Sequence, residues 1–282
     1  MNTYRHDSCP LCRAKGADCK AVIAYHTPVL FSNHEVVIEV PPELWVCRHC
    51  GSWFVQNIFP EELAKRYYAE GASGERWSNV AVEVSKTPDV IKELGTLFQK
   101  ETRILDIGCN TGALLDFAKD RGCQTSGVEF SCDSRLVLSQ KGHTTYSSLN
   151  EVTGRFDIIT AFDLVEHLYR IADFFDVCRS LLTPSGRFVI LTGNINSMSA
   201  RLTQSKWWYL RYPEHIVFPS KKVIDTYPGF KMSRWMPTYA SAGYKHSLID
   251  MCQGVMISFL MGNYEGLPSL GPDHVLAVLD KC

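Results

Sequence analysis

One segment of the chain combines an acidic residue, two glycines and a helix start at a spacing that suits cofactor binding. The short apolar run Ile104-Leu-Asp-Ile107 ends in the turn Gly108-Cys-Asn-Thr-Gly112, and an Ala/Leu-rich helical stretch follows at once. A turn of this kind lets backbone N–H groups approach a ligand closely. A second apolar run delivers Glu129, 23 residues after Asp106, where a carboxylate at a strand end can accept both hydroxyls of a ribose. The spacing therefore predicts a site for an adenosine-type cofactor.

The glycine spacing separates two classes of cofactor. A dinucleotide site needs Gly-x-Gly-x-x-Gly, and only part of that pattern is in register here. Asp106 would also point a carboxylate at the pyrophosphate, whereas a carboxylate suits a ligand that carries an ammonium and a sulfonium. Asp-x-Gly-x-x-x-Gly followed by Glu129 resembles motifs I and II of class I S-adenosylmethionine-dependent methyltransferases. Asn110 stands where that family often has glycine, and asparagine tolerates left-handed backbone angles.

Two later blocks resemble the same family and follow in the same order. The run from Phe156 to Phe162 reads as a buried strand that leads to the pair Glu166-His167, as in motif IV of many small-molecule methyltransferases. Leu181-Leu-Thr-Pro-Ser-Gly-Arg-Phe-Val-Ile-Leu191 resembles the block that closes the same core. The resemblance spans roughly residues 101–195 and implies S-adenosylmethionine as the cofactor. The residues it implies as cofactor contacts are Asp106, Gly108, Cys109, Asn110, Thr111, Gly112, Glu129, Phe130, Ser131, Phe162 and Asp163.

Alternating strand and helix signals surround these motifs. Strands are expected at 102–107, 124–129, 143–147, 156–162, 187–192, 231–235 and 274–279, and helices at 112–121, 131–141 and 169–182. Strands that alternate with helices require a parallel, doubly wound α/β sheet. The family resemblance implies a Rossmann-like sheet of seven strands with the last strand antiparallel. We expect this methyltransferase domain at 101–282, after a helical connector at 59–100 that has a joint at Gly71–Gly74 and a second helix from about Val80 to Gln99.

Four cysteines near the N-terminus form two pairs, Cys9-Pro-Leu-Cys12 and Cys47-Arg-His-Cys50, and glycine follows the second pair. Two such pairs supply four thiolates for a closed tetrahedral site, which is the structural form of a zinc site. We expect a small zinc-binding module at 1–58, with strands between the pairs. No open coordination position is suggested, so catalysis by this metal is not expected. The other seven cysteines show no pairing and are expected to be free thiols, because no secretory signal accompanies them.

The stretch from Asn194 to Phe218 leaves the carboxyl end of a core strand, which is where open α/β sheets bind ligands. We expect it to form a substrate lid at about 194–218. Its aromatic side chains can stack on a sugar or a flat ring and exclude water, and packing of the tryptophans on the core is the alternative. The candidate substrate contacts are Trp207, Trp208, Tyr209, Tyr212 and, from the connector helix, Tyr68.

Two histidines are candidates for proton transfer. His215 follows Glu214, and the string Tyr212-Pro-Glu-His215 resembles the segment that carries the proposed base in sugar C-methyltransferases. Histidine titrates near neutrality, and the adjacent carboxylate of Glu214 is expected to orient the ring or raise its pKa. The alternative for this segment is a loop anchor. His167 is the second candidate, because it follows the motif IV strand, and capping of a helix is its structural alternative.

Composition limits the partners. The chain has 29 Lys and Arg against 30 Asp and Glu, a net charge of −1, so nothing favours nucleic acid or an anionic membrane. Its start has no apolar core of a signal peptide, and its longest apolar patch, Val255 to Met261, is too short to span a bilayer. We expect a cytoplasmic protein, with the oligomeric state left open.

The expected activity follows from the resemblance. It implies methyl transfer from S-adenosylmethionine to a small-molecule acceptor, a sugar or natural-product intermediate, and we expect O-methylation. C-methylation of a nucleotide-linked keto-sugar is the closest alternative. A cofactor-binding module whose zinc unit recruits a partner is the non-enzymatic alternative, and an NAD-linked oxidoreductase is the most distant one.

Overall fold

The computed structural model describes residues 3–25, 28–31, 34–70, 87–239 and 271–282, with a few positions between 249 and 256. Its strands are β1 (Ala17–Val22), β2 (Val29–Phe31), β3 (His34–Val36), β4 (Glu43–Cys47), β5 (Trp53–Gln56), β6 (Arg103–Ile107), β7 (Gln124–Val128), β8 (Thr144–Tyr146), β9 (Phe156–Phe162), β10 (Leu182–Gly193), β11 (Val217–Phe218), β12 (Phe230–Thr238) and β13 (His274–Lys281). Its helices are α1 (Glu61–Glu70), α3 (Pro88–Leu97), α4 (Ala113–Lys119), α5 (Cys132–Gln140), α6 (Ile171–Leu181), α7 (Met198–Thr203) and α8 (Lys221–Asp225), with short 3-10 turns η1 (Leu149–Glu151), η2 (Val165–His167) and η3 (Gln204–Lys206).

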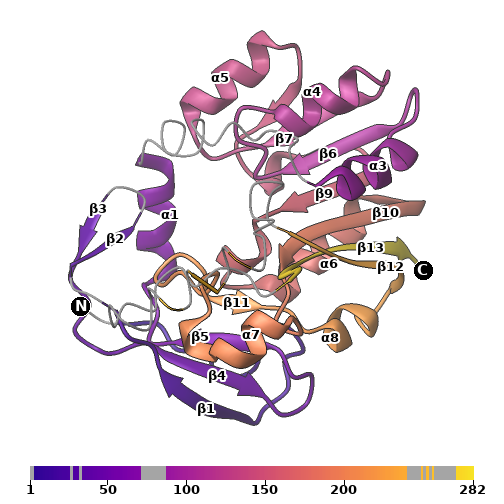
Figure 1. The fold of residues 1–282 in the computed structure, drawn as a ribbon. Helices are drawn as coiled ribbons and strands as arrows, with labels where there is room; N and C mark the ends of the chain where they lie inside the picture. The colour runs from indigo at the N-terminus through magenta and orange to yellow at the C-terminus, as the bar shows by residue number, and fades with distance from the viewer. Residues whose placement is uncertain are drawn as a thin grey trace.

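The larger sheet has seven strands in the order β12-β13-β10-β9-β6-β7-β8 (Figure 1). The pairs β6–β7, β7–β8, β6–β9 and β9–β10 are parallel, whereas β13 runs antiparallel to both of its neighbours, β10 and β12. The prediction of a doubly wound, Rossmann-like sheet with an antiparallel last strand is therefore confirmed. The strand order reverses between β6 and β9, so the carboxyl ends of these two strands mark the switch point at which such sheets bind ligands.

Alternate residues of the central strands enter two separate cores, because successive side chains of a strand point to opposite faces. Leu105 packs in the core that contains Phe175 of α6, whereas its neighbour Ile104 packs in the core that contains Leu94 of α3 and Leu115 of α4. Both strand residues are fully buried. Burial on both faces explains why these strands are mostly apolar, with Asp106 as the polar exception in β6.

A second sheet of four strands, in the order β1-β4-β5-β11, forms the N-terminal module. Three of its strands come from the first 58 residues, but β11 comes from the end of the lid. Val217 pairs with Phe54 and Phe218 with Trp53, and Figure 1 shows β11, in orange, beside the indigo β5. The module and the lid therefore share one sheet. The joint at 71–74 and the first part of the helix expected from residue 80 lie outside the described residues, and α3 begins at Pro88.

The lid packs tightly on the end of β10. A Cβ atom at Gly193, the last residue of that strand, would lie 2.2 Å from the ring of Tyr209, so only glycine allows this approach. The lid begins here with Asn194, whose N–H donates to the carbonyl of Asp273 at 2.7 Å. The lid is thus held against the start of β13 as well as against β10.

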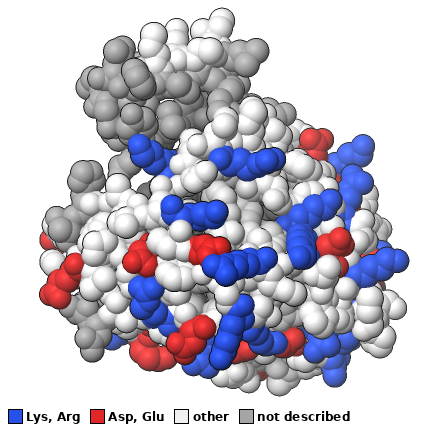
Figure 2. Space-filling model, turned by 90° about the horizontal axis from the view of Figure 1, so that it is seen from below, with Lys and Arg blue, Asp and Glu red and all other residues white. Residues whose placement is uncertain are grey.

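Charges of both signs lie side by side on the face shown in Figure 2. Among the ion pairs of the described residues, the guanidinium of Arg13 lies 2.8 Å from the carboxylates of both Asp173 and Asp176. Within the described part of the chain, no helix is long and apolar enough to cross a membrane.

Candidate functional site

The turn between β6 and α4 adopts the backbone that its sequence predicts. Gly108, Asn110 and Gly112 all have positive φ, of 74°, 48° and 85°. The N–H of Gly112 donates to the carbonyl of Cys109 at 2.9 Å, and the N–H of Gly108 donates to the carbonyl of Val128 at 2.9 Å. Asparagine thus occupies the left-handed position where glycine was the expected residue.

Glu129 closes this turn from the end of β7. One carboxylate oxygen accepts the N–H of Asn110 and the other accepts the N–H of Ser131, both at 2.9 Å. Ser131 in turn caps α5 by accepting the N–H of Ser134 at 3.4 Å. The structure therefore brings together the two acidic motifs and the loop residues that the sequence predicts as one site, and the ring of the neighbouring Phe130 is 55% exposed beside them.

Asp106 lies beneath the turn as a buried carboxyl group. The hydroxyl of Thr160, on β9, donates to it at 2.6 Å. Burial raises the pKa of Asp106 to about 7; the Thr160 hydrogen bond opposes this shift and the charge of Glu129 adds to it. A cationic ligand at this place would favour the ionised carboxylate.

A second polar group, around Glu166 of η2, lies at the carboxyl ends of β9 and β10. Glu166 is fully buried and accepts hydrogen bonds from the hydroxyl of Thr192, at 2.9 Å, and from the hydroxyl of Tyr209. Tyr209 also donates to Asp163 at 3.3 Å. Burial raises the pKa of Glu166. The carboxyl group is thus held by two donors from β10 and the lid.

His215 is buried next to Glu166 in a defined tautomer. Its Nδ1 lies 2.6 Å from the carbonyl oxygen of Tyr209, and a carbonyl can only accept, so Nδ1 carries the hydrogen. Burial, followed by the nearby His167, lowers the pKa of His215 well below its usual value. The ring is therefore neutral at neutral pH, and its Nε2 keeps a lone pair that can accept a proton.

His167 meets His215 edge to face, with ring centroids 4.7 Å apart. Its Nδ1 lies 3.0 Å from the carbonyl oxygen of Glu214 and 3.1 Å from the hydroxyl of Tyr68 on α1. Two sequence expectations are affected. Tyr68 does reach the histidines from the connector helix. The expectation that Glu214 raises the pKa of His215 is wrong, because burial dominates and the carbonyl of Tyr209 orients the ring.

The lid aromatics divide into two groups. Trp207 and Tyr209 are almost completely buried, and Trp207 packs against Trp53 and Phe218 with ring centroids 6.4 and 5.7 Å away. Core packing, the alternative for the lid tryptophans, therefore describes Trp207. Trp208 and Tyr212 are only partly buried, so acceptor contact stays a prediction for these two.

Several polar residues of the site were not singled out from the sequence. Glu166 was taken as a neighbour of His167, although it lies at the centre of the group. Asp273 and His274, at the start of β13, form a buried pair with a carboxylate-to-Nδ1 distance of 3.0 Å, and the ring of Tyr209 lies 4.5 Å from that of His274. The sequence signal for these residues is a pair of polar side chains, Asp273 and His274, directly before the apolar run Val275–Leu279.

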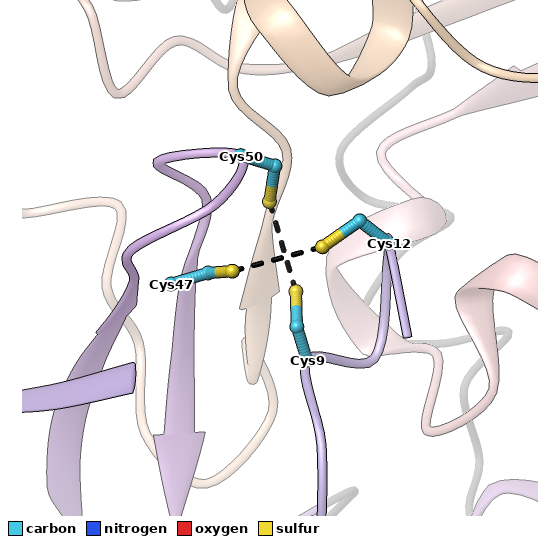
Figure 3. Close-up of side chains that lie close together, drawn as sticks. All are labelled: Cys9, Cys12, Cys47 and Cys50. Carbon is cyan, nitrogen blue, oxygen red and sulfur yellow. Dashed lines mark hydrogen bonds between the residues drawn. The ribbon is translucent and has the colours of Figure 1, made fainter. Parts of the chain in front are cut away.

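The four paired cysteines converge as expected (Figure 3). The sulfurs of Cys9 and Cys50 are 3.7 Å apart and those of Cys12 and Cys47 are 3.6 Å apart. A tetrahedron with zinc–sulfur bonds of about 2.3 Å has edges of about 3.8 Å, so the spacing fits one metal ion. A second group that could hold a metal ion is Glu166, His167 and His215, whose ligand atoms lie within 4.8 Å of one another.

Comparison with known proteins identifies the family. A family model described as a methyltransferase domain matches residues 77–226. Among curated proteins, the ubiquinone biosynthesis O-methyltransferase of Nitrobacter winogradskyi is 34% identical over 110 residues, which cover 36% of this chain and 42% of that protein. The enzyme of the same name from Pseudomonas aeruginosa is 26% identical over 105 residues, which cover 33% and 45%. The matches thus span less than half the length of these relatives.

A solved structure has the same fold. The magnesium protoporphyrin IX methyltransferase from Synechocystis PCC 6803, with bound S-adenosylhomocysteine, aligns with a TM-score of 0.53 at 13% identity and covers 79% of this chain and all of that one. At this identity the similarity concerns the fold alone.

Proposed function

Because the chain belongs to the class I S-adenosylmethionine-dependent methyltransferases, we propose that it moves a methyl group from this cofactor to a small-molecule acceptor. The observation that carries the proposal is the presence of two sites at the carboxyl ends of neighbouring parallel strands of one sheet, β6, β9 and β10. One is the turn closed by Glu129 over the buried Asp106, and the other is the polar group around Glu166 and His215. The first suits a cationic adenosine cofactor and the second suits an acceptor that loses a proton.

The chemistry needs alignment and one proton transfer. The methyl group is already activated by the sulfonium, so the protein must hold the acceptor atom, the methyl carbon and the sulfur in line, which contributes up to about 7–11 kcal/mol. Removal of a proton from the acceptor adds about 100- to 10,000-fold. His215 is the proposed base, because its Nε2 is the free nitrogen of a neutral ring.

O-methylation of a sugar or natural-product intermediate is the proposed reaction. The name O-methyltransferase of the curated relatives supports oxygen as the acceptor atom. C-methylation remains the closest alternative, since it needs the same base. The partly buried Trp208 and Tyr212 are proposed as the aromatic wall for the acceptor.

We further propose that the four-cysteine cluster binds one structural zinc ion. Four thiolates complete the coordination shell, so the ion would fix the fold of the N-terminal module and take no part in the reaction. The proposed division of the chain is this module at 1–58, a connector at 59–100 and the methyltransferase domain at 101–282.

The test combines binding with product detection. Calorimetry should show binding of S-adenosylmethionine, and Glu129→Ala should weaken it by about 1.5–3 kcal/mol, the range for a lost charged hydrogen bond. Glu151→Ala is the matched control, because the Glu151 carboxylate accepts hydrogen bonds from the N–H and the hydroxyl of Ser147, four residues earlier in the chain. A screen of candidate acceptors with isotopically labelled cofactor should then reveal a mass shift.

Two results would contradict the proposal in different ways. Binding of NAD without any response to the methyl donor would refute the cofactor. Binding of the methyl donor with no methylated product from a broad set of hydroxyl, carbon and amine acceptors would favour the non-catalytic alternative.

A further inference from the structure

Two buried serines connect the metal cluster to the lid. The hydroxyl of Ser52 lies 3.2 Å from the sulfur of Cys50 and accepts the N–H of Ser220 at 3.1 Å. The hydroxyl of Ser220 donates to the carbonyl of Cys50 at 2.6 Å. Ser220 follows the lid and caps α8 by accepting the N–H of Val223 at 3.1 Å. Ser220 thus makes two hydrogen bonds next to the cluster, one to Ser52 and one to Cys50, which lie 168 and 170 positions before it in the chain.

The connection continues to the acceptor side of the proposed active site. The N–H of Val55, on β5, donates to the carbonyl of Ile216 at 2.8 Å. The N–H of Ile216 donates to the carbonyl of Glu166 at 2.7 Å. Ile216 therefore lies between the metal-bearing sheet and Glu166, and the residue before it is His215. A shift of β5 would therefore displace Glu166 and His215.

The first cysteine pair contacts the same half of the molecule at another point. The carbonyl of Pro10, between Cys9 and Cys12, accepts the N–H of Ala172 at the start of α6 at 3.2 Å. Helix α6 follows η2, which carries Glu166 and His167. An ion that joins the two cysteine pairs therefore joins two supports of the acceptor site. The hydrogen bonds of the cofactor turn, by contrast, run to Val128, Cys109 and Glu129 within the core.

We propose that Ser52 and Ser220 are positioning residues, through which the metal-bound Cys50 sets the place of Glu166 and His215. In the structure the Cys50 thiol donates to the Ser52 hydroxyl. With a metal ion bound, Cys50 would be a thiolate, and the Ser52 hydroxyl would donate to it while still accepting the N–H of Ser220. Groups that hydrogen-bond to metal ligands typically change affinity or activity by about 10–100-fold when they are removed. This proposal rests on the proposed function in one respect, which is that the acceptor binds next to Glu166 and His215.

The test uses the full-length, metal-loaded protein and two serine variants. Ser52→Ala and Ser220→Ala should each lower kcat and raise KM for the acceptor, so that kcat/KM falls by about 10-fold or more. The dissociation constant of S-adenosylmethionine should change less than about twofold. Ser220→Thr, which keeps the hydroxyl, should restore most of the loss. Ser180→Ala is the matched control, because Ser180 bonds to Val177 within α6 and is exposed.

Amide hydrogen exchange gives a readout that does not need activity. In both alanine variants, and in wild-type protein treated with a chelator, the Ile216 amide should exchange faster, while the Gly108 amide of the cofactor turn should not change. Equal acceleration at Gly108 and Ile216, or a matching loss of cofactor affinity, would show general destabilisation and overturn the proposal. Unchanged kinetics and unchanged Ile216 exchange in all three samples would also overturn it. If the wild type methylates no acceptor, the proposed function fails, and the exchange data still decide whether the cluster is coupled to Ile216.

Discussion

At the scale of single residues, Asp106 is a buried carboxyl group whose ionised form a cationic cofactor would stabilise. Its pKa is raised from 3.8 to about 7, so between these values the folded chain holds a proton that the unfolded chain has lost. The contribution of Asp106 to stability without ligand therefore falls as pH rises from about 4 to about 7. A cofactor that favours the carboxylate should release this proton on binding.

The affinity for S-adenosylmethionine should consequently rise with pH up to about 7 and then level off, by at most about tenfold per unit. Calorimetry in buffers of different ionisation enthalpy measures the released proton directly. The Asp106→Asn variant should bind S-adenosylmethionine more weakly, and its affinity should not depend on pH in this range. The same pH dependence in that variant would assign the proton to another group.

His215 is the residue on which the reaction type depends. Burial lowers the pKa of His215 well below 6.5. In the free enzyme the ring is therefore unprotonated at neutral pH and becomes protonated only in acidic solution. The turnover number should therefore stay level through neutral pH and fall only in more acidic solution. Since the unfolded histidine protonates near 6.5, this group also makes stability fall as pH drops below about 6.5.

His215→Ala should cut turnover by about 100-fold or more with little change in cofactor affinity. Glu151→Ala, whose side chain bonds to Ser147, is again the control. A rise in KM larger than the loss of kcat would indicate a carboxylate acceptor that needs no base. Full activity at saturating acceptor would remove His215 from the mechanism. A different outcome would assign Glu166, His167 and His215 to metal binding. In that case a chelator would abolish the activity of the wild type, and a divalent cation would restore it in the wild type but not in His215→Ala.

At the scale of elements, α1 supplies two tyrosines with different roles. The hydroxyl of Tyr68 contacts His167, whereas the ring of Tyr67 stacks on His34 at 4.2 Å. Tyr68→Phe should lower turnover by about 5- to 10-fold, since it removes one hydrogen bond of about 1 kcal/mol. Tyr67→Phe should not, because stacking does not need the hydroxyl. Equal effects of the two changes in steady-state kinetics would contradict a specific role of Tyr68.

The core elements were predictable, and the lid was not. Apolar runs such as Phe188–Leu191 indicate strands buried on both faces, and the positive φ angles of the turn between Gly108 and Gly112 follow from its glycines and asparagine. The packing of Trp207 on Trp53 and the pairing of β11 with β5 depend on contacts between distant parts of the chain. The tautomer of His215 depends on the irregular backbone of the lid, which brings the carbonyl of Tyr209 to the ring. No periodicity in the sequence encodes such contacts.

At the scale of the whole molecule, the four-cysteine cluster and the cofactor turn belong to different sheets, the cluster to the four-stranded sheet and the turn to the seven-stranded one. Elemental analysis should find about one zinc per chain, held by the four cysteines. Removal of the metal should loosen the N-terminal sheet, and S-adenosylmethionine should still bind, because the hydrogen bonds that hold the cofactor turn run to Val128 and Glu129 of the seven-stranded sheet and its loops. Protein purified without metal that melts normally would contradict this, as would loss of cofactor binding on chelation.

The position of β13 has a consequence for the order in which the chain folds. This strand lies between β10 and β12, although both are synthesised before it. Until residues 274–281 leave the ribosome, the fully buried Phe188–Leu191 segment has an unpaired edge, and an edge of this kind can pair with other chains. A nascent or truncated chain that ends before β13 should therefore aggregate or need a chaperone, so the yield of soluble protein is decided by the last strand of the sheet to be made.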